Sequence, residues 1–419
     1  MSSTAVSAEQ EGDYIVHGMM CSYFTKKLEA YFLVKGIPYQ VVESDSPDFV
    51  QCGDKVGVAQ LPQVQCPDGS WLTDTTPIIE HFESDTQLIA LRPENPVARF
   101  CSYFLEDCFD EWLWAPAMYY RWAFKMDAER RSEEFCYTIL ANGLKLPRWL
   151  YKPLITWRQK AVHLKGNGIH TAAHAHCIEE LYLDILDLLQ PIFSKRPYLF
   201  GERPCEADFG LFGPMFPHFG NDPTPQEIMH VRAPHVARWL GRLWSTRPQE
   251  VAAAPELQAV PADLKPIMQK MAREYLPYLV ANQKAFLAGA KTTTYTLHSL
   301  EWEVTTAPYR VYCLSQLQQR YQTLSAEDQQ LVSGLLGHES TTILSQPVNC
   351  PAQMQNVSAA QPVQKTSKGT VGRQWEIEDN FFDNISKRRL RGKSSGSVPE
   401  KKGIGTGWLP IYFKRYRAR

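Results

Sequence analysis

The first ninety residues alternate between two hydrophobic periods, as expected for a small domain that mixes strands and helices. Short apolar or alternating runs are typical of strands, and apolar positions at a spacing of three to four residues are typical of helices. A Pro-Asp-Gly turn joins the last two strand-like runs. Together these patterns predict a thioredoxin-like α/β domain over residues 13–90. The predicted strands cover residues 14–18, 39–43, 61–66 and 70–72, and the predicted helices run from Phe24 to Gly36 and from Thr76 to Phe82.

From residue 96 onward only helical spacing recurs, which predicts an all-helical domain over residues 96–250. A second change predicts a helix-hairpin-helix extension over residues 260–337. Residues 338–419 begin with a stretch rich in Ser, Thr, Gln and Pro, so we expect a largely disordered tail there, and a flexible segment over residues 1–12. The predicted helices cover about 96–131, 132–140, 171–189, 206–215, 233–244 and 266–288, with an irregular basic stretch over 143–168, a hairpin over 292–305 and a helix from Arg310.

Charge is distributed unevenly along the chain. The net charge is −1, yet residues 387–419 hold eleven Lys or Arg residues and one acid, a local charge of +10. We expect this basic tail to make weak, salt-sensitive contact with anionic surfaces. There is no apolar stretch long enough for a membrane span and no signal-peptide pattern, and the ten cysteines lack paired spacing. These features predict a reduced, cytoplasmic location.

One stretch near the N-terminus carries a family resemblance. Ser-Tyr-Phe-Thr-Lys-Lys-Leu-Glu at residues 22–29 leads to Gly-Ile-Pro-Tyr at residues 36–39. It resembles the first helix of the glutathione transferase superfamily, especially the branch with the metaxins and failed-axon proteins and related bacterial proteins. The resemblance implies that Ser22 is the catalytic residue, whose hydroxyl donates a hydrogen bond to the thiolate of glutathione at a helix N-terminus. The plainer alternative is that Ser22 only caps the helix.

Two further motifs of the first domain resemble the same family. Leu61-Pro62 resembles the cis-proline corner that pairs with the cysteinyl part of glutathione. Asp74-Thr75 resembles the acid–hydroxyl pair that receives the γ-glutamyl end, with Asp74 suited to the ammonium and Thr75 to the carboxylate. The resemblance therefore implies glutathione-binding residues at Leu61, Pro62, Asp74 and Thr75. A helix cap is the alternative for the last pair.

The helical domain supplies two more resemblances. Residues 201–209 resemble the family's capping box, with Cys205 in the usual Ser or Thr position and Asp208 retained. The stretch from Asp110 to Trp122 resembles bacterial members of the group. This resemblance implies that Tyr119, Tyr120 and Trp122 line a co-substrate pocket, although most such aromatics belong to cores.

The resemblance implies an overall architecture and a function. A thioredoxin-like domain followed by an all-helical domain would bind glutathione as co-substrate and conjugate its thiolate to a small electrophile, and it allows a homodimer. One alternative is a non-catalytic, metaxin-like scaffold of the same fold. The other is a thiol oxidoreductase that uses Cys21 as nucleophile. No metal site is expected, because the histidines at 170, 174 and 176 lack an acidic partner at metal-site spacing.

Overall fold

The computed structural model describes residues 13–57, 60–138 and 147–351, so the predicted flexible N-terminus and residues 352–419 of the predicted tail lie outside the described residues. The first domain contains a four-stranded sheet in the order β2-β1-β3-β4, with β2 parallel and β3 antiparallel to β1. This topology confirms the predicted thioredoxin-like domain. Its elements are β1 (Tyr14–Gly18), α1 (Tyr23–Lys35), β2 (Tyr39–Glu43), α2 (Ser46–Val56), β3 (Gln63–Gln65), β4 (Trp71–Thr73) and α3 (Thr75–Glu83).

The ends of α1 follow from local chemistry. Ser22 accepts a hydrogen bond from the Thr25 backbone N–H at 3.3 Å, which satisfies one of the unpaired donors at the helix start. Gly36 ends the helix with φ 81°, a left-handed conformation that costs glycine little. The helix is buried along most of its length, so it forms the centre of the first domain and also faces the helical domain.

The second domain is entirely helical, as expected. The long helix predicted from residue 96 is divided into three, because Leu113 forms a turn between α4 and α5 and Phe124 adopts an extended conformation after α5. Cys205 begins α9, and its backbone N–H donates to the Asp208 carboxylate at 3.1 Å, which supplies the retained half of the capping box. The elements are α4 (Pro96–Trp112), α5 (Trp114–Ala123), α6 (Lys125–Thr138), α7 (Arg148–Lys160), the π-helical turn η1 (Ala161–Lys165), α8 (Ala172–Phe193), α9 (Glu206–Pro214), the π-helical turn η2 (Met215–Phe219), α10 (Pro223–Arg232), α11 (Pro234–Ser245) and α12 (Pro248–Ala253).

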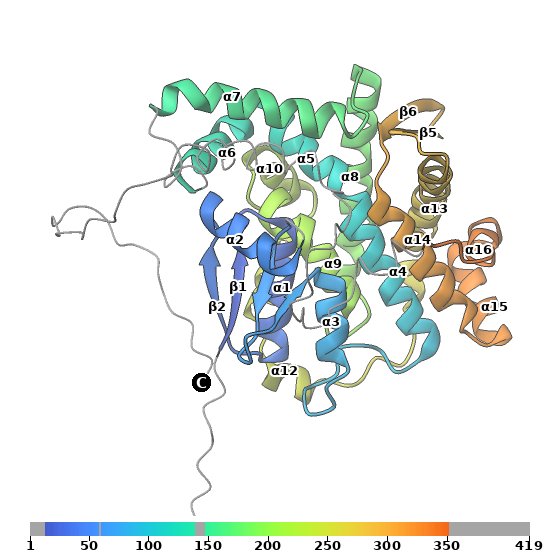
Figure 1. The fold of residues 1–419 in the computed structure, drawn as a ribbon. Helices are drawn as coiled ribbons and strands as arrows, with labels where there is room; N and C mark the ends of the chain where they lie inside the picture. The colour runs from blue at the N-terminus through green and yellow to red at the C-terminus, as the bar shows by residue number, and fades with distance from the viewer. Residues whose placement is uncertain (1–12, 58–59, 139–146, 352–419) are drawn as a thin grey trace, which may run out of the picture.

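The extension contains the predicted helix, hairpin and helix, and it continues further. Helix α16 occupies the start of the stretch that was predicted to be disordered. In Figure 1 the last helices lie on the side of the molecule away from β2. The elements are the 3-10 turn η3 (Ala262–Leu264), α13 (Lys265–Leu287), β5 (Thr292–Leu297), β6 (Leu300–Thr305), α14 (Pro308–Gln322), α15 (Ala326–Leu336) and α16 (His338–Leu344).

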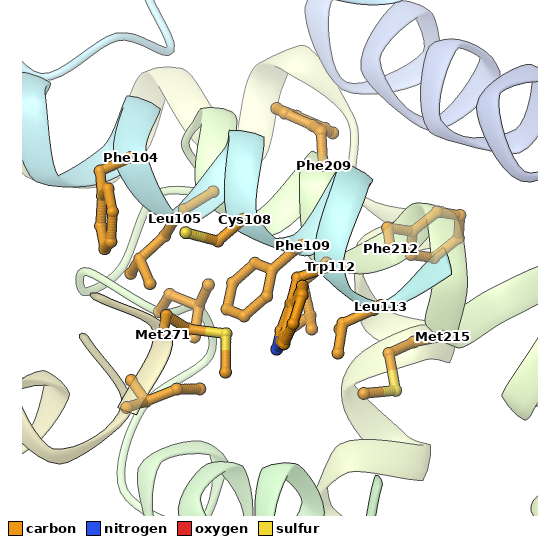
Figure 2. Close-up of a cluster of buried hydrophobic side chains, with 14 of the residues drawn as sticks. Phe104, Leu105, Cys108, Phe109, Trp112, Leu113, Phe209, Phe212, Met215 and Met271 are labelled. Carbon is orange, nitrogen blue, oxygen red and sulfur yellow. The ribbon is translucent and has the colours of Figure 1, made fainter. Parts of the chain in front are cut away.

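One hydrophobic core joins the two domains and the extension. A single cluster of buried side chains runs from Val16 of β1 to Leu344 of α16. Figure 2 shows Phe109 and Trp112 of α4 beside Met271 of α13 in this cluster. Burial of a side chain such as Phe109 stabilises the fold by roughly 1.5–3 kcal/mol. The extension is therefore part of the same folded body as the first two domains, which the sequence alone did not indicate.

Two segments differ from the sequence expectation. Residues 148–160, within the predicted irregular stretch, form α7, because Tyr151 and Ile155 lie one turn apart and are both buried beside Cys136 of α6. Residues 46–56 form α2, a helix that the periodicity did not reveal. No helix of the described residues is long and apolar enough to cross a membrane.

Candidate functional site

A cavity of about 390 Å³ lies where the first domain, the helical domain and the extension meet. Of the predicted site residues, the cavity brings together Ser22, Leu61, Asp74, Thr75, Trp122 and the alternative nucleophile Cys21. The extension contributes Thr305 to Arg310 to the same wall. The cavity therefore combines residues that are far apart in the sequence and come from three parts of the fold.

Ser22 borders the cavity at the N-terminus of α1. Its hydroxyl oxygen accepts the capping bond from Thr25, so its proton and a second lone pair are available for a further hydrogen bond. A thiolate beside this position would accept a hydrogen bond from the hydroxyl and would also lie at the positive end of the α1 dipole. The helix-cap interpretation and the catalytic interpretation of Ser22 are therefore compatible.

Cys21 also borders the cavity, but its environment is different. The side chain is buried, and burial raises the pKa of the thiol above its ordinary value despite the nearby Arg131 and Arg121 guanidinium groups. A raised pKa reduces the thiolate fraction at neutral pH, and the thiolate is the nucleophilic form. This environment suits a packed thiol better than a reactive one.

The Leu61–Pro62 peptide bond is cis, as the predicted corner requires. Leu61 lies in the cavity wall, and the strand β3 begins directly after Pro62. An exposed backbone edge at such a corner can pair with an extended peptide ligand. The role of the two residues in binding glutathione stays a prediction.

Asp74 occupies an unusual backbone conformation before α3. Its φ of 71° lies in the left-handed region, which non-glycine residues adopt only where surrounding contacts enforce it. The carboxylate does not cap α3 and instead accepts a hydrogen bond from the Tyr309 hydroxyl at 3.2 Å. Burial raises the pKa of Asp74 to about 7, although the bond from Tyr309 and the charge of Lys27 act to lower it. Asp74 is therefore close to half ionised at neutral pH.

A buried network of ionic side chains, centred on Lys27, lies next to the cavity. The Lys27 ammonium donates to the carboxylates of Glu106 and Asp110, and all three side chains are buried. Burial lowers the pKa of Lys27, but Asp110 and Glu106 raise it more, so the net pKa lies above the ordinary value. Thr76 of α3 also donates to Glu106 at 2.7 Å. This network links α1, α3 and α4 and fixes the two domains against each other beneath the cavity.

Acidic groups are concentrated on the side of the cavity that the extension covers. Asp107, Asp110 and Glu111 of α4 line it together with Asp74. Burial raises the pKa of Asp107 to about 8, so this carboxyl is mostly protonated at neutral pH. The Arg310 Nε donates to Glu111 at 2.9 Å and balances its charge. These two effects reduce the negative potential that an anionic ligand would meet.

The opposite side of the cavity is aromatic. Trp122 of α5 stacks on His163, with ring centroids 6.2 Å apart, and Trp114 stacks on Phe24 at 6.3 Å. Burial lowers the pKa of His163 to about 3, so its ring is neutral and adds no charge to this side. An apolar group could therefore pack against these rings, although the Arg121 and Arg158 guanidinium groups also line the cavity near His163.

Tyr119 and Tyr120 were predicted to share this pocket with Trp122, and the structure does not bring them to the cavity. The Tyr119 hydroxyl donates to Glu179 at 2.5 Å, and the Tyr120 ring packs against Tyr182 at 5.0 Å. Successive residues of α5 point in different directions, so only one of its faces meets the cavity. Both tyrosines belong to the core between α5 and α8.

The sequence did not point to Tyr309, Arg310, Trp114 or His163 as cavity residues. Tyr309 lies 235 residues from Asp74 in the chain, and no motif connects the two. Only the packing of the extension against α4 brings them together. An aromatic residue followed by arginine at the start of a helix is too common to signal such a contact.

Within the described ranges, one group of side chains could share a metal ion: His17, Asp48 and Cys52, whose donor atoms lie within 4.8 Å of one another. The His17 Nδ1 already hydrogen-bonds Asp48 at 3.0 Å. Burial raises the pKa of Cys52 to about 12, and the Asp48 carboxylate adds to the rise, so the thiol is protonated at neutral pH. The bond between His17 and Asp48 gives the cluster a structural role in the first domain.

The histidines at 170, 174 and 176 serve different structural contacts. His174 Nε2 lies 3.0 Å from the Glu301 carbonyl, and His170 Nε2 lies 3.4 Å from the Glu303 carbonyl. His176 lies 3.2 Å from Glu180 on its own helix. The first two attach the β5–β6 hairpin to α8 and do not converge on one point. The absence of a metal stays an expectation from the sequence.

Comparison with protein families gives one match that bears on this site. Residues 16–88 match the model of the glutathione S-transferase N-terminal domain. This match shows that the first domain is of the glutathione S-transferase N-terminal type. Within the matched range lie Ser22, Leu61, Pro62, Asp74 and Thr75. A search of curated proteins gave no match, and the metaxin branch stays an expectation from the sequence.

A search of solved structures matches part of the chain to several glutathione transferases. A Tau class enzyme from mango, Mangifera indica, is 15% identical with a TM-score of 0.36, and the match covers 59% of this chain and 94% of that one. A beta-etherase from Sphingobium is 18% identical with a TM-score of 0.40, covering 57% and 99%. A glutathione S-transferase from Methylobacterium radiotolerans, in complex with glutathione sulfonate, is 18% identical with a TM-score of 0.35, covering 60% and 98%. At these values the likeness carries no functional argument.

Proposed function

We propose that this protein, as a member of the glutathione transferase superfamily, binds glutathione in the cavity and conjugates its thiolate to a small, apolar electrophile. The observation that carries the proposal is that Ser22, Leu61, Asp74 and Thr75, which come from three separate motifs, border one cavity. In this arrangement the γ-glutamyl ammonium meets Asp74, the γ-glutamyl carboxylate meets the start of α3 at Thr75, and the thiol lies beside Ser22. The electrophile occupies the aromatic side at Trp122.

The mechanism needs two contributions from the protein. The Ser22 hydroxyl and the N-terminus of α1 stabilise the thiolate, so that more of the bound thiol is ionised at neutral pH. The aromatic side holds the electrophile close to the sulfur, which replaces a bimolecular encounter by an oriented one. No covalent bond to the protein is required.

The direct test is calorimetric titration of the full-length protein with glutathione and with S-methylglutathione, whose thiol is blocked. Saturable binding of both, together with turnover of a generic aromatic electrophile, is the expected result. A dissociation constant in the millimolar range or weaker for both ligands would support the non-catalytic scaffold instead, because such a ligand would give negligible linked stabilisation.

Replacing Ser22 with alanine should raise the pKa of the bound glutathione thiol by about one unit, since one unit corresponds to about 1.4 kcal/mol of lost thiolate stabilisation. The thiolate absorbance near the ultraviolet edge, followed against pH, measures this pKa. Turnover should fall in parallel while glutathione still binds. The matched control is Ser325→Ala, because Ser325 caps α15 in the same way, accepting from the Asp328 N–H at 3.1 Å, but lies away from the cavity. An unchanged thiol pKa in Ser22→Ala would reduce Ser22 to a helix cap.

Cys21 carries the second candidate function, because it borders the same cavity. A thiol oxidoreductase would form a mixed disulfide between Cys21 and oxidised glutathione. Mass spectrometry would detect the adduct as an increase in the mass of the protein. Reductant should remove this increase, and Cys21→Ala should abolish it. The raised pKa of the buried thiol argues for the opposite result, in which no adduct forms under mild oxidation.

Replacing Tyr309 with phenylalanine should weaken the binding of S-methylglutathione at pH 7 by about 1 kcal/mol. The hydrogen bond from Tyr309 lowers the pKa of Asp74, so its loss leaves the carboxyl more protonated and less able to hold the ligand ammonium. In titrations between pH 6 and 8.5, the affinity of the wild type for S-methylglutathione should rise with pH. In the variant this rise should occur at higher pH, so the difference in affinity between the two proteins should shrink toward pH 8.5. Tighter binding at every pH would instead mean that Tyr309 competes with the ligand for Asp74.

A further inference from the structure

Helix α7 presents an apolar face to solvent along its whole length. Its exposed side chains include Trp149, Leu150, Leu154 and Trp157, with exposed fractions of 73%, 46%, 52% and 68%. Pro153 is exposed among them. Spacings of one, four, five and eight residues place all five on one side of a helix. We call these five residues the α7 face.

Within the described residues, the α7 face remains exposed to solvent. The opposite side of the helix is already packed, because Tyr151 and Ile155 are buried beside Cys136 of α6. In Figure 1, α7 runs along an outer edge of the molecule. Single exposed apolar residues are ordinary, but a continuous stripe with two tryptophans on a helix marks a surface that is covered in some other state.

The charge around the helix indicates what covers it. Residues 143–168 hold six Lys or Arg residues and no Asp or Glu. Lys152 pairs with Glu133 of α6 at 2.7 Å, which neutralises one of these charges, while Lys160 and Lys165 lie on the following turns. Tryptophan and leucine on the outward side of a basic helix are the composition that binds at the headgroup level of anionic membranes.

Two other occupants fit the charges less well. A second copy of the chain, meeting the first through the same helix, would bring together two segments that each hold six Lys or Arg residues and no acid of their own, and the neighbouring Glu133 already pairs with Lys152. The chain's own tail from residue 387 to 419 carries a local charge of +10 and would be repelled in the same way. A negatively charged surface would attract this basic helix instead of repelling it.

We propose that α7 docks the protein on anionic phospholipid membranes by inserting the α7 face among the headgroups. The helix lies in the plane of the interface, with Trp149 and Trp157 as anchors and Lys160 and Lys165 against the lipid phosphates. Arg158 and Gln159 of the same helix line the cavity, so the docked orientation places the cavity close to the membrane surface. The inference stands on the surface alone and does not depend on the proposed catalysis.

The test is co-sedimentation of the full-length protein with vesicles of phosphatidylcholine containing about 30% phosphatidylserine, compared with phosphatidylcholine alone. The wild type should partition onto the anionic vesicles, and the double variant Trp149→Ser, Trp157→Ser should bind at least about tenfold more weakly. Lys160→Glu should weaken binding to the anionic vesicles only. Brominated lipid should quench tryptophan fluorescence in the wild type and not in the double variant.

The matched control is the double variant Val231→Ser, Leu331→Ser, which removes two other exposed apolar side chains, 82% and 54% exposed, from α10 and α15. It should bind like the wild type. Urea unfolding checks that all variants fold. If the double tryptophan variant still binds the vesicles as the wild type does, the binding belongs to the basic tail and the proposal is overturned. A dimer in sedimentation velocity that the tryptophan variant dissociates, with no vesicle binding, would overturn it in favour of a second copy.

Discussion

Replacing Lys27 with methionine is expected to lower the free energy of unfolding by about 3–5 kcal/mol, the usual cost of removing one partner of a buried ion pair. The side chain is fully buried and donates to both Glu106 and Asp110. Methionine has a similar length and fills the same space, so the loss reflects two carboxylates left without a cation. Urea unfolding at pH 7 measures the change.

The pH dependence of this loss separates charge from packing. The two orphaned carboxylates can take up protons in acid, so the cost of Lys27→Met should shrink between pH 7 and pH 5. Adding Glu106→Gln and Asp110→Asn to the same chain should restore most of the stability, because the buried charges are then removed together. The control Lys125→Met breaks an exposed pair with Glu129 and should change stability by less than about 0.5 kcal/mol. A Lys27 variant as stable as this control would show that the network contributes nothing.

Replacing Asp74 with asparagine is expected to stabilise the protein relative to wild type as the pH rises. The folded-state pKa of Asp74 is raised to about 7, whereas an unfolded aspartate titrates near 3.9. The folded state therefore holds the proton that the unfolded state has released, and wild-type stability falls between about pH 4 and pH 7. Three pKa units would give about 4 kcal/mol, and the partial access of Asp74 to the cavity reduces this to about 2–4 kcal/mol.

The measured quantity is the difference in unfolding free energy between variant and wild type at pH 4, 5.5 and 7.5. A difference is needed because Asp107 and Asp208 also have raised pKa values within or next to this range, and their contributions are the same in both proteins. The control Asp68→Asn concerns an exposed carboxyl whose hydrogen bonds to Ser70 lower its pKa, so it should not reproduce the rise. A difference independent of pH would mean that Asp74 is ionised throughout. The same variant should bind S-methylglutathione more weakly by about 1–3 kcal/mol. The carboxylate that lowers the stability of the fold would then be the group that binds the ligand.

Most of the first domain, with the exception of α2, could be predicted from the sequence because its signals are local. Glycine with φ 81° after α1, the turn between β3 and β4 and the alternating strands each depend on neighbouring residues only. The same holds for the capping position of Ser22, whereas the cis bond before Pro62 was expected only from the family resemblance, because most bonds before proline are trans. The motifs that led to Ser22, Leu61, Asp74 and Thr75 lie within residues 16–88, where the family match was found.

The walls of the cavity depended on tertiary structure, because they are formed by contacts between distant residues. Helical periodicity placed Tyr119, Tyr120 and Trp122 on one helix, but only the packing of α5 decided that Trp122 faces the cavity. The contact of Tyr309 with Asp74 spans 235 residues, and the pKa of Asp74 follows from burial that no local pattern expresses. The sequence by itself therefore determined the first domain and its motifs. Long-range packing decided that the extension joins the core, covers the acidic side of the cavity and leaves α7 exposed, because burial and pKa depend on which elements pack together and not on neighbours along the chain.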